Sequence, residues 1–331
     1  MIIESRAYAR AGLLGNPSDG YFGKTISIIV RNFGAYVSLY ETPELCIEPL
    51  EQDRNIFRNI YHFIDSVQLT GYYGGDRLVK AGIKKFYEYC DQAGIRLHNR
   101  NFTIRYRSTI PRQVGLAGSS AIITATLRAL MQFYQVQIPL PEQPNLILAA
   151  EKEELGINAG LQDRVIQVYE GCVFMDFDKA YMEEHGHGLY ERIDPSLLPN
   201  LYIAYKTELG KVSGVIFNDI RKRYEEGDHV VGDTLAEVAR LAERGRKAIA
   251  KRDLTALHKM INRNFDLRSS IMNISESNLE LIQRARACGA SAKFTGSGGS
   301  IIGTYDDDDV LKSLIIEMKR IRARVIKPFI M

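Results

Sequence analysis

The sequence predicts an α+β fold divided into two domains. Segments with strand-like alternation and segments with helical periodicity mix irregularly along the chain, which favours α+β over a doubly wound parallel sheet. The chain has 331 residues, of which 45% are hydrophobic, enough to fill one large core or two ordinary ones. Periodicity is lost between residues 178 and 200, where polar residues, glycines and prolines gather. We therefore expect one domain at 1–185 and a second at 186–331.

In the first half, alternation predicts strands and periodicity predicts helices. Residues 26–30 and 37–39 alternate on either side of Gly34 and predict two antiparallel strands joined by a turn. Residues 102–106 alternate in the same way and predict a further strand. Between these strands, the apolar residues of 79–90 lie three and four positions apart, which predicts a helix with one buried face.

The helix expected after residue 118 should be central to the fold. Ile123, Leu127 and Leu130 form one stripe and smaller residues cover its flank, so we expect it to be buried on most sides. Further along, residues 201–206 predict a strand. Three more helices are predicted by the periodicity of residues 235–249, 254–272 and 310–321.

The net charge and the cysteines limit the kinds of partner. Lys and Arg total 43 against 40 Asp and Glu, and the formal charge of +3 is too small to indicate a nucleic-acid surface. The 4 cysteines lie far apart and form no C-x-x-C pair, as expected in a reducing compartment. No apolar stretch approaches the length of a membrane span. We expect a cytoplasmic protein, a monomer or small homo-oligomer, that binds small molecules and neither nucleic acid nor membranes.

The stretch "PRQVGLAGSSAI" places glycines and two serines directly before a helix. Backbone N–H groups at a helix N-terminus bind anions, and Gly115 and Gly118 would let a phosphate come close. Ser119 or Ser120 could offer a hydroxyl to a phosphate oxygen or to Mg²⁺. An ordinary turn followed by a helix cap explains the same residues, and the Walker P-loop pattern is absent.

A second glycine-rich stretch follows near the C-terminus. Gly296, Gly298 and Gly299 interrupt an apolar strand pattern between Phe294 and Ile301. The close approach of another backbone or of a ligand would explain them, and a hairpin turn would explain them equally well.

Two further segments carry candidate polar side chains. A turn rich in Gly and Pro holds Asn16 and Asp19 after Arg10, and it could bind a hydroxylated ligand or simply form an Asx turn. Glu151 and Asp163 flank a glycine-rich bend that could bring both carboxylates to one cavity. One could hold Mg²⁺ while the other accepts a proton or orients a hydroxyl.

These pieces, in this order, resemble the GHMP kinase family. "PRQVGLAGSSA" is similar to the family's second motif, P-x-x-x-G-L-x-x-S-S-A, and "KFTGSGGSIIG" is similar to its glycine-rich C-terminal motif. The resemblance runs from about residue 7 to at least residue 303. It implies the family's two-domain α+β fold, with ATP bound by the domain at 1–185 and the active site in the cleft between the domains.

Within that family, segments such as "GLLGNPSD" and "GLQDRV" are similar to those of members that act on a sugar acid. The resemblance implies ATP-dependent phosphorylation of the anomeric C1 hydroxyl of D-glucuronate, giving D-glucuronate 1-phosphate. The alternatives are a kinase of the same fold for galacturonate, fucose or a heptose phosphate, and a sugar sensor of the same fold without activity. Asn16 and Pro17 replace the Glu-His of the galactokinase-like first motif, which argues against galactose.

The resemblance also implies roles for particular residues. Asp163 would be the base or the orienting group for the sugar hydroxyl, and Arg10 would stabilise the transferring phosphoryl group. Ser120 and Glu151 would bind Mg²⁺, with Glu153 as the alternative carboxylate. The residues expected at ATP are Pro111, Gly115, Leu116, Ala117, Gly118, Ser119, Ser120, Ala121, Gly296, Ser297 and Gly298. Those expected at the sugar are Asn16, Asp19, Tyr21, Arg112 and Arg164, and either of the two arginines could pair with the sugar carboxylate.

Overall fold

The computed structural model describes residues 1–49, 74–207 and 214–330. The chain separates into two compact units of discontinuous sequence. Unit 1 comprises Met1–Ala9, Phe33–Ile110 and Ala117–Ala159, and unit 2 comprises Arg10–Asn32, Pro111–Leu116 and Gly160–Met331. Strands β1 (Ile2–Leu14) and β2 (Lys24–Thr42) contribute residues to both units. The division at residues 185 and 186 stays a prediction.

Unit 1 combines an antiparallel sheet with helices. Residues Ala35 to Thr42 of β2 pair antiparallel with β4 (Asn101–Ser108), and β3 (Cys46–Glu48) pairs in parallel with β4. Its helices are α2 (Gly75–Gln92), α3 (Gly118–Tyr134), α4 (Gln143–Ala149) and the π-helical turn η3 (Ala150–Glu154). The predicted strand at 102–106 and the predicted helix over 79–90 are confirmed by β4 and α2.

Helix α3 is more extensively buried than α2 and α4. Eleven of its residues are buried, on all of its sides. Leucine, alanine and isoleucine favour the helical conformation here, and the helix ends where Gln135 adopts a left-handed backbone conformation. The prediction that this helix is buried on most sides is confirmed.

The prediction of a turn at Gly34 is wrong, because β2 is one continuous strand. Gly34 is buried in the strand, and its backbone N–H and C=O bond Thr109 just beyond β4. The strand changes its partner instead of turning: Lys24 to Ile28 pair with β5 (Cys172–Asp176), and residues from Ala35 onward pair with β4. Alternation on both sides of the glycine is therefore that of a single long strand.

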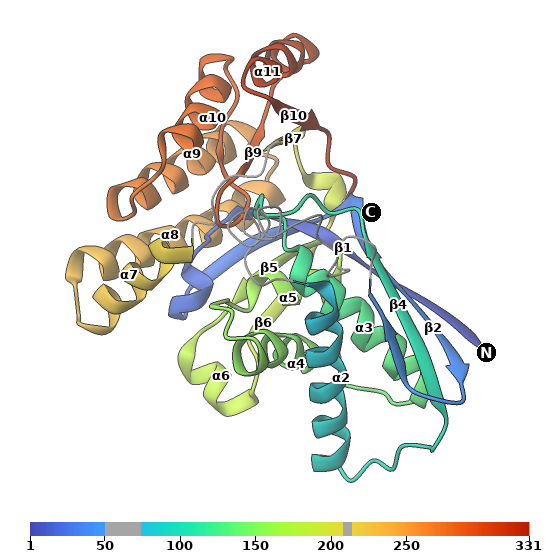
Figure 1. The fold of residues 1–331 in the computed structure, drawn as a ribbon. Coiled ribbons are helices and arrows are strands. Elements are labelled where there is room, and N and C mark those ends of the chain that lie inside the picture. The colour runs from blue at the N-terminus through green and yellow to red at the C-terminus, as the bar shows by residue number, and fades with distance from the viewer. Residues whose placement is uncertain (50–73, 208–213, 331) are drawn as a thin grey trace, which may run out of the picture. The chain divides into compact units, whose positions relative to one another are not determined.

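Unit 2 contains a second sheet covered by helices. Strands β7 (Leu201–Lys206), β8 (Lys293–Phe294), β9 (Ser300–Thr304) and β10 (Ala323–Ile326) form it in the order β10-β7-β9-β8, with antiparallel neighbours. The helices of this unit are α5 (Gln162–Tyr169), α6 (Lys179–His185), α7 (Gly214–Glu225), α8 (His229–Ala250), α9 (Leu254–Ile271), α10 (Glu276–Ala287) and α11 (Asp308–Arg320). Figure 1 shows α9, α10 and α11 beside this sheet.

The core of this region lies between the helices and the second sheet. Phe265 of α9, Leu281 of α10 and Leu314 of α11 pack in one buried cluster with Phe294 and Ile301 of the sheet. Aspartates begin the helices: the Asp253 carboxylate accepts from an N–H of α9, and the Asp307 carboxylate accepts from two of α11. The predicted strand at 201–206 and the three predicted helices are confirmed by β7, α8, α9 and α11.

Residues 178–200, predicted to be a connection, contain regular structure. Helix α6 begins at a cap provided by Asp178, and β6 (Leu189–Ile193) pairs antiparallel with β5. Both elements are short, and most of their residues are not buried. The apolar pattern that would reveal them is therefore weak.

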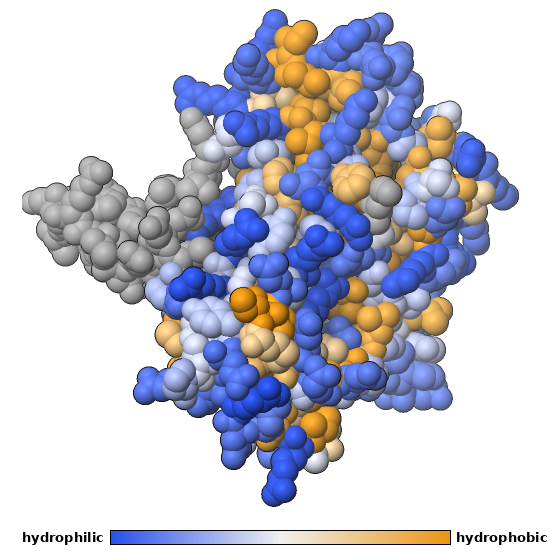
Figure 2. Space-filling view, turned by 90° about the vertical axis from the view of Figure 1, so that its right-hand side faces the viewer, coloured by the Kyte–Doolittle hydropathy of each residue, from blue (hydrophilic) through white to orange (hydrophobic). Residues whose placement is uncertain are grey.

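On the face seen in Figure 2, hydrophilic residues predominate and hydrophobic residues gather in small groups between them. Within the described parts of the chain, no helix is long and apolar enough to cross a membrane.

Candidate active site

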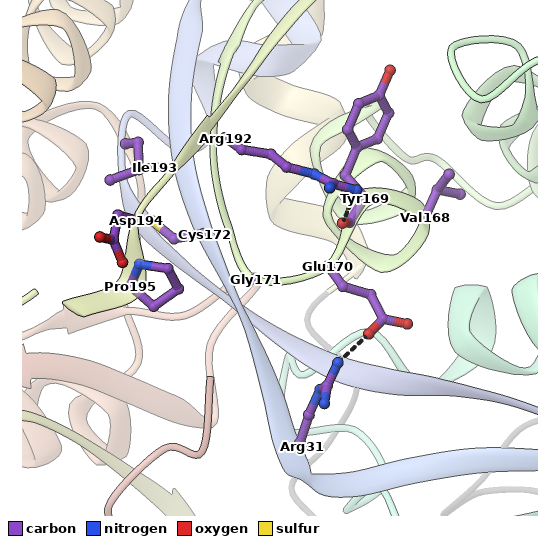
Figure 3. A pocket seen from close by; sticks show the side chains of 10 residues that line it. All are labelled: Arg31, Val168, Tyr169, Glu170, Gly171, Cys172, Arg192, Ile193, Asp194 and Pro195. Carbon is purple, nitrogen blue, oxygen red and sulfur yellow. Dashed lines mark hydrogen bonds and ion pairs between the residues drawn. The ribbon is translucent and has the colours of Figure 1, made fainter. Parts of the chain in front are cut away.

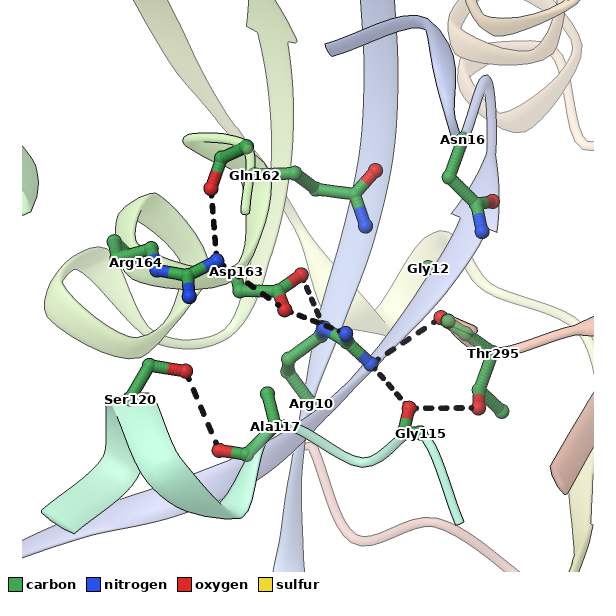
Figure 4. A network of polar contacts seen from close by, with 12 residues as sticks. Arg10, Gly12, Asn16, Gly115, Ala117, Ser120, Gln162, Asp163, Arg164 and Thr295 are labelled. Atoms are coloured by element: carbon green, nitrogen blue, oxygen red, sulfur yellow. Dashed lines mark hydrogen bonds and ion pairs between the residues drawn. The ribbon is translucent and has the colours of Figure 1, made fainter. Parts of the chain in front are cut away.

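An ion pair between a buried arginine and a partly exposed aspartate stands at the centre of the candidate site in unit 2. Arg10 reaches it from β1, and Asp163 lies in the first turn of α5 (Figure 4). Arg10 Nε donates to Asp163 Oδ1 at 2.5 Å, and Nη2 donates to Oδ2 at 2.6 Å. Arg10 is 5% exposed. Two parallel, charge-assisted bonds fix both side chains in one orientation.

The charge of Asp163 is set by two opposing effects. Burial raises the pKa of the Asp163 carboxyl, but the charge and hydrogen bonds of Arg10, together with Arg164, outweigh it and hold that pKa below its usual value. Asp163 is therefore ionised at neutral pH. It can orient a hydroxyl group or accept its proton.

Asp19 is a second carboxylate of the site, carried by the 3-10 helix η1 (Ser18–Tyr21). Its Oδ2 accepts a hydrogen bond from the backbone N–H of Gln162 at 3.3 Å. Burial and the negative charge of Asp163 raise the pKa of Asp19 to about 6. A Cβ on Gly160 would lie 2.1 Å from Asp19 Oδ2, so the carboxylate fits only because residue 160 is glycine.

The two glycine-rich stretches meet beside Arg10. A Cβ on Gly115 would lie 2.7 Å from the carbonyl oxygen of Gly298, and one on Gly296 would lie 2.6 Å from that of Gly115. Arg10 Nη1 donates to Gly115 O at 2.6 Å. The glycines of the second stretch therefore allow the backbone at Gly115 to come close. The same stretch joins the antiparallel strands β8 and β9.

The site also contains a buried lysine, which the sequence patterns did not predict. Lys293 of β8 is 1% exposed and donates to Gly12 O at 2.6 Å, to Phe294 O at 2.8 Å and to Asn16 Oδ1. Burial and the positive charges of Arg268 and Arg10 lower the pKa of Lys293 well below its usual value. The only signal in the sequence is a lysine at the start of "KFTGSGG" where an apolar strand residue would be expected.

Arg268 of α9 is a further buried cation that the sequence analysis missed. Its Nη1 donates to Gly296 O at 2.8 Å, and its guanidinium lies 5.2 Å from the centre of the Phe294 ring. Burial lowers the pKa of Arg268 to about 10. The sequence offers no signal for it, because an arginine on a helix is normally expected at the surface.

The second half of the predicted phosphate loop begins α3 in unit 1. Ala117, in a left-handed backbone conformation, precedes the helix, and no side chain in the described residues caps its first turn. Ser119 is partly exposed, and Ser120 is buried with its Oγ 3.5 Å from Ala117 O. Neither serine is therefore the N-cap residue, and anion binding by the backbone N–H groups of this turn stays a prediction.

The acidic residues of η3 differ in their burial and in their partners. Glu151 is buried, whereas Glu153 and Glu154 pair with Lys85 and Lys84 of α2 at 2.6 and 2.7 Å. Glu151 belongs to unit 1 and Asp163 to unit 2, so their meeting in one cavity stays a prediction. Within the described ranges, no group of three or more His, Cys, Asp or Glu side chains could hold a metal ion.

The predicted sugar-binding residues occupy different settings. Arg164 is buried, with Nη1 donating to Gly160 O at 2.8 Å and lying 3.5 Å from Asp163 Oδ2. Arg112 is exposed. Tyr21 packs edge-on against Tyr224 at 4.8 Å between ring centres. Their contacts to a sugar stay predictions.

A separate pocket of about 550 Å³ lies elsewhere in unit 2. Its lining includes an ion pair between Arg31 and Glu170, and Arg192, which donates to the carbonyl oxygen of Tyr169 (Figure 3). None of the predicted site residues lines it. Its cysteine, Cys172, has a pKa raised to about 12 by burial and is not a nucleophile at neutral pH.

Comparison with known proteins finds family models that match both halves of the chain. The model of the GHMP kinases N terminal domain matches residues 77–171, and that of the GHMP kinases C terminal matches residues 246–320. Two proteins of Arabidopsis thaliana are similar along most of the chain. Probable glucuronokinase 2 is 46% identical over 308 residues, and glucuronokinase 1 is 45% identical over 306; each match covers 91% of this chain and 84% of the relative.

Solved structures share the fold at low sequence identity. The galactokinase of Lactococcus lactis, complexed with galactose, has a TM-score of 0.76 at 16% identity, over 99% of this chain and 93% of that chain. The mevalonate kinase of Methanococcus jannaschii has a TM-score of 0.71 at 20% identity, over 100% and 98%. At these identities the likeness shows the fold alone.

Proposed function

The chain belongs to the GHMP kinase family, and from this membership we propose that it transfers a phosphoryl group from ATP to the anomeric hydroxyl of D-glucuronate. The products are ADP and D-glucuronate 1-phosphate. The observation that carries the proposal is the 45–46% identity to two glucuronokinases over 91% of the chain. The Arg10–Asp163 pair beside two glycine-rich loops supplies groups suited to this chemistry.

Phosphoryl transfer depends mainly on positioning and on donors already directed at the developing negative charge. The backbone N–H groups of Gly115 to Ser119 are proposed to hold the triphosphate of ATP. Arg10 has five N–H donors. Contacts with Asp163, Gly115 and Thr295 use four of them and leave one on Nη2. We assign that remaining N–H and the guanidinium charge to the transferring phosphoryl group.

Asp163 is proposed to act on the sugar hydroxyl. It is ionised at neutral pH, so it can accept a hydrogen bond from the C1 hydroxyl and then its proton as the bond to phosphorus forms. Asp19 is proposed to accept from a second sugar hydroxyl. Arg10 holds the orientation of Asp163, so the acceptor oxygen need not reorganise during the reaction.

Mg²⁺ is the expected companion of ATP and would neutralise phosphate charge when bound. Ser120 and Glu151 are proposed to hold it. Both are buried oxygen donors of unit 1. Mg²⁺ bound with nucleotides usually takes one or two protein ligands and completes its shell with phosphate oxygens and water. Two protein ligands therefore suit such an ion, whereas a cage of three or more carboxylates is not required.

The proposal is tested by ADP release with ATP and, in parallel, D-glucuronate, D-galacturonate, D-galactose and L-fucose. Turnover should be greatest with D-glucuronate, and phosphorus NMR should identify an anomeric phosphate. Asp163→Asn is the control: it should lower kcat by about 10²-fold or more while changing KM little. Equal turnover of all four sugars, or none, would refute the assignment.

A further inference from the structure

One buried amide of the site has an atom without a partner. Gln162, at the start of α5, is 2% exposed, and its backbone N–H donates to Asp19. Its side-chain Oε1 has no hydrogen-bond partner among the described residues. In Figure 4 the side chain extends from α5 toward Gly12 and Asn16. Buried amide oxygens normally have a hydrogen-bond partner, so Gln162 Oε1 has capacity to accept from a ligand hydroxyl.

A second amide approaches the same place from the other side. A Cβ on Gly12 would lie 2.9 Å from Gln162 Nε2 and 3.0 Å from Asn16 Oδ1. The side chains of Gln162 and Asn16 therefore face each other across a glycine. Any larger residue at position 12 would displace one of them.

Lys293 fixes the orientation of the Asn16 amide. Its ammonium donates to Asn16 Oδ1, so the oxygen of that amide is turned toward the lysine. The other amide atom, Asn16 Nδ2, makes only a long contact of 3.5 Å with Phe294 O. Asn16 Nδ2 is therefore a donor with capacity for an acceptor on a ligand.

The acceptors around Lys293 are all neutral. They are Gly12 O, Phe294 O and Asn16 Oδ1, and no carboxylate lies within 4.0 Å of its Nζ among the residues that the structure describes. Its other charged neighbours, Arg268 and Arg10, are positive. A buried ammonium without an anion is costly, and a bound anion close to it would provide the missing negative charge.

We propose that Asn16 Nδ2 donates to the carboxylate of a sugar acid, that Gln162 Oε1 accepts from a neighbouring sugar hydroxyl, and that Lys293 is the positioning residue whose charge selects the acid over a neutral sugar. This inference rests on the proposed function and replaces Arg112 and Arg164 as the determinants of acid specificity. Lys293 bonds Asn16 of the turn assigned to the sugar, whereas Arg10 bonds Gly115 of the loop assigned to ATP. We therefore assign the sugar carboxylate, and not a phosphate of ATP, as the anion that balances the charge of Lys293.

The test compares D-glucuronate with D-glucuronamide, which has nearly the same shape but no charge. Wild-type protein should favour the acid in kcat/KM by about 100-fold, the effect expected for a buried charge that finds its partner. Lys293→Met should reduce this preference to less than about 10-fold, mainly through the KM for the acid. Lys293→Arg should restore part of it, because it restores the charge.

Further variants separate this role from a structural one. Gln162→Glu places a negative charge beside the carboxylate and should weaken binding of the acid far more than binding of the amide. Lys312→Met, on the exposed face of α11, is the matched control and should leave the preference unchanged. Thermal denaturation checks that each variant is folded. Equal losses with acid and amide in Lys293→Met, or a loss confined to the KM for ATP, would overturn the proposal.

Calorimetric binding of the acid and the amide to the wild-type protein separates this inference from the proposed function. If D-glucuronate binds in preference to D-glucuronamide but is not phosphorylated, the proposed function fails and the carboxylate subsite stands. If both sugars are phosphorylated with equal kcat/KM, the kinase activity stands and the subsite is refuted.

Discussion

The raised pKa of Asp19 predicts an unusual dependence of stability on pH. The pKa of Asp19 is about 6 in the folded protein, against 3.8 ordinarily. Each pKa unit corresponds to about 1.4 kcal/mol, so ionising this carboxyl costs the folded state about 3 kcal/mol. Because the pKa of Asp19 is raised in the folded state, protonated Asp19 favours the folded protein. This contribution to the free energy of unfolding is complete below pH 3.8 and is lost as pH rises through 6. Asp19→Asn removes the titration and keeps the shape of the side chain.

Equilibrium urea unfolding of wild-type protein and Asp19→Asn, followed by circular dichroism from pH 4.5 to 8, measures this effect. About 2 of the 3 kcal/mol fall within that range, so the variant should gain about 2 kcal/mol over the wild type as pH rises. By contrast, the difference between wild type and Asp163→Asn should change little from pH 4.5 to 8. The folded pKa of Asp163 is lowered, so the stability that ionised Asp163 provides is present above pH 3.8 and is lost as pH falls.

The reasoning would be refuted by a difference between wild type and Asp19→Asn that changes by less than about 0.5 kcal/mol over this range. A change of the opposite sign would show that Arg10 and Arg164 dominate the environment of Asp19. Either result would also remove Asp19 as a group that ionises near pH 6 in the enzyme.

Three further predictions concern the loops and the charges of the site. Gly115→Ala should destabilise the protein by at least about 2 kcal/mol more than Gly94→Ala. Both glycines have positive φ, but only a Cβ at Gly115 would meet another backbone. Similar melting temperatures for the two variants would contradict this packing. Arg10→Lys keeps the charge but loses the paired bonds to Asp163, so kcat should fall by about 10²-fold in steady-state ADP release, and a kcat near that of the wild type would exclude the role of the guanidinium. Ser120→Ala should raise the Mg²⁺ concentration for half-maximal activity by about 10-fold, whereas an unchanged Mg²⁺ dependence would remove Ser120 as a ligand.

Local patterns were sufficient to predict five helices and the strands β4 and β7, whereas β1, β5, α5 and α10, among others, were not predicted. The helices α2, α3, α8, α9 and α11 have apolar residues at helical spacing, and their burial follows from that spacing. The error at Gly34 arose because a glycine between two alternating segments has the same pattern whether the strand turns or continues. The decision depended on Thr109, which is 75 residues away and bonds Gly34 at both backbone atoms.

The candidate site was predictable only where its residues stood in recognisable motifs. Arg10 and Asp163 were assigned from the resemblance, and their direct pairing is a finding of the structure. Lys293 was missed because a lysine is normally expected at the surface. Its three acceptors include Gly12 and Asn16, more than 270 residues earlier in the chain, and no local pattern reveals such contacts.

The exchange of partners along β2 limits how the protein can be dissected. Neither unit corresponds to one uninterrupted stretch of gene, so no single truncation yields either unit alone and complete. A chimera that transplants the ion-paired site into another kinase must graft three separate segments, Arg10–Asn32, Pro111–Leu116 and the chain from Gly160 onward. Transplanting only the segment from Gly160 onward would leave Asp163 without Arg10.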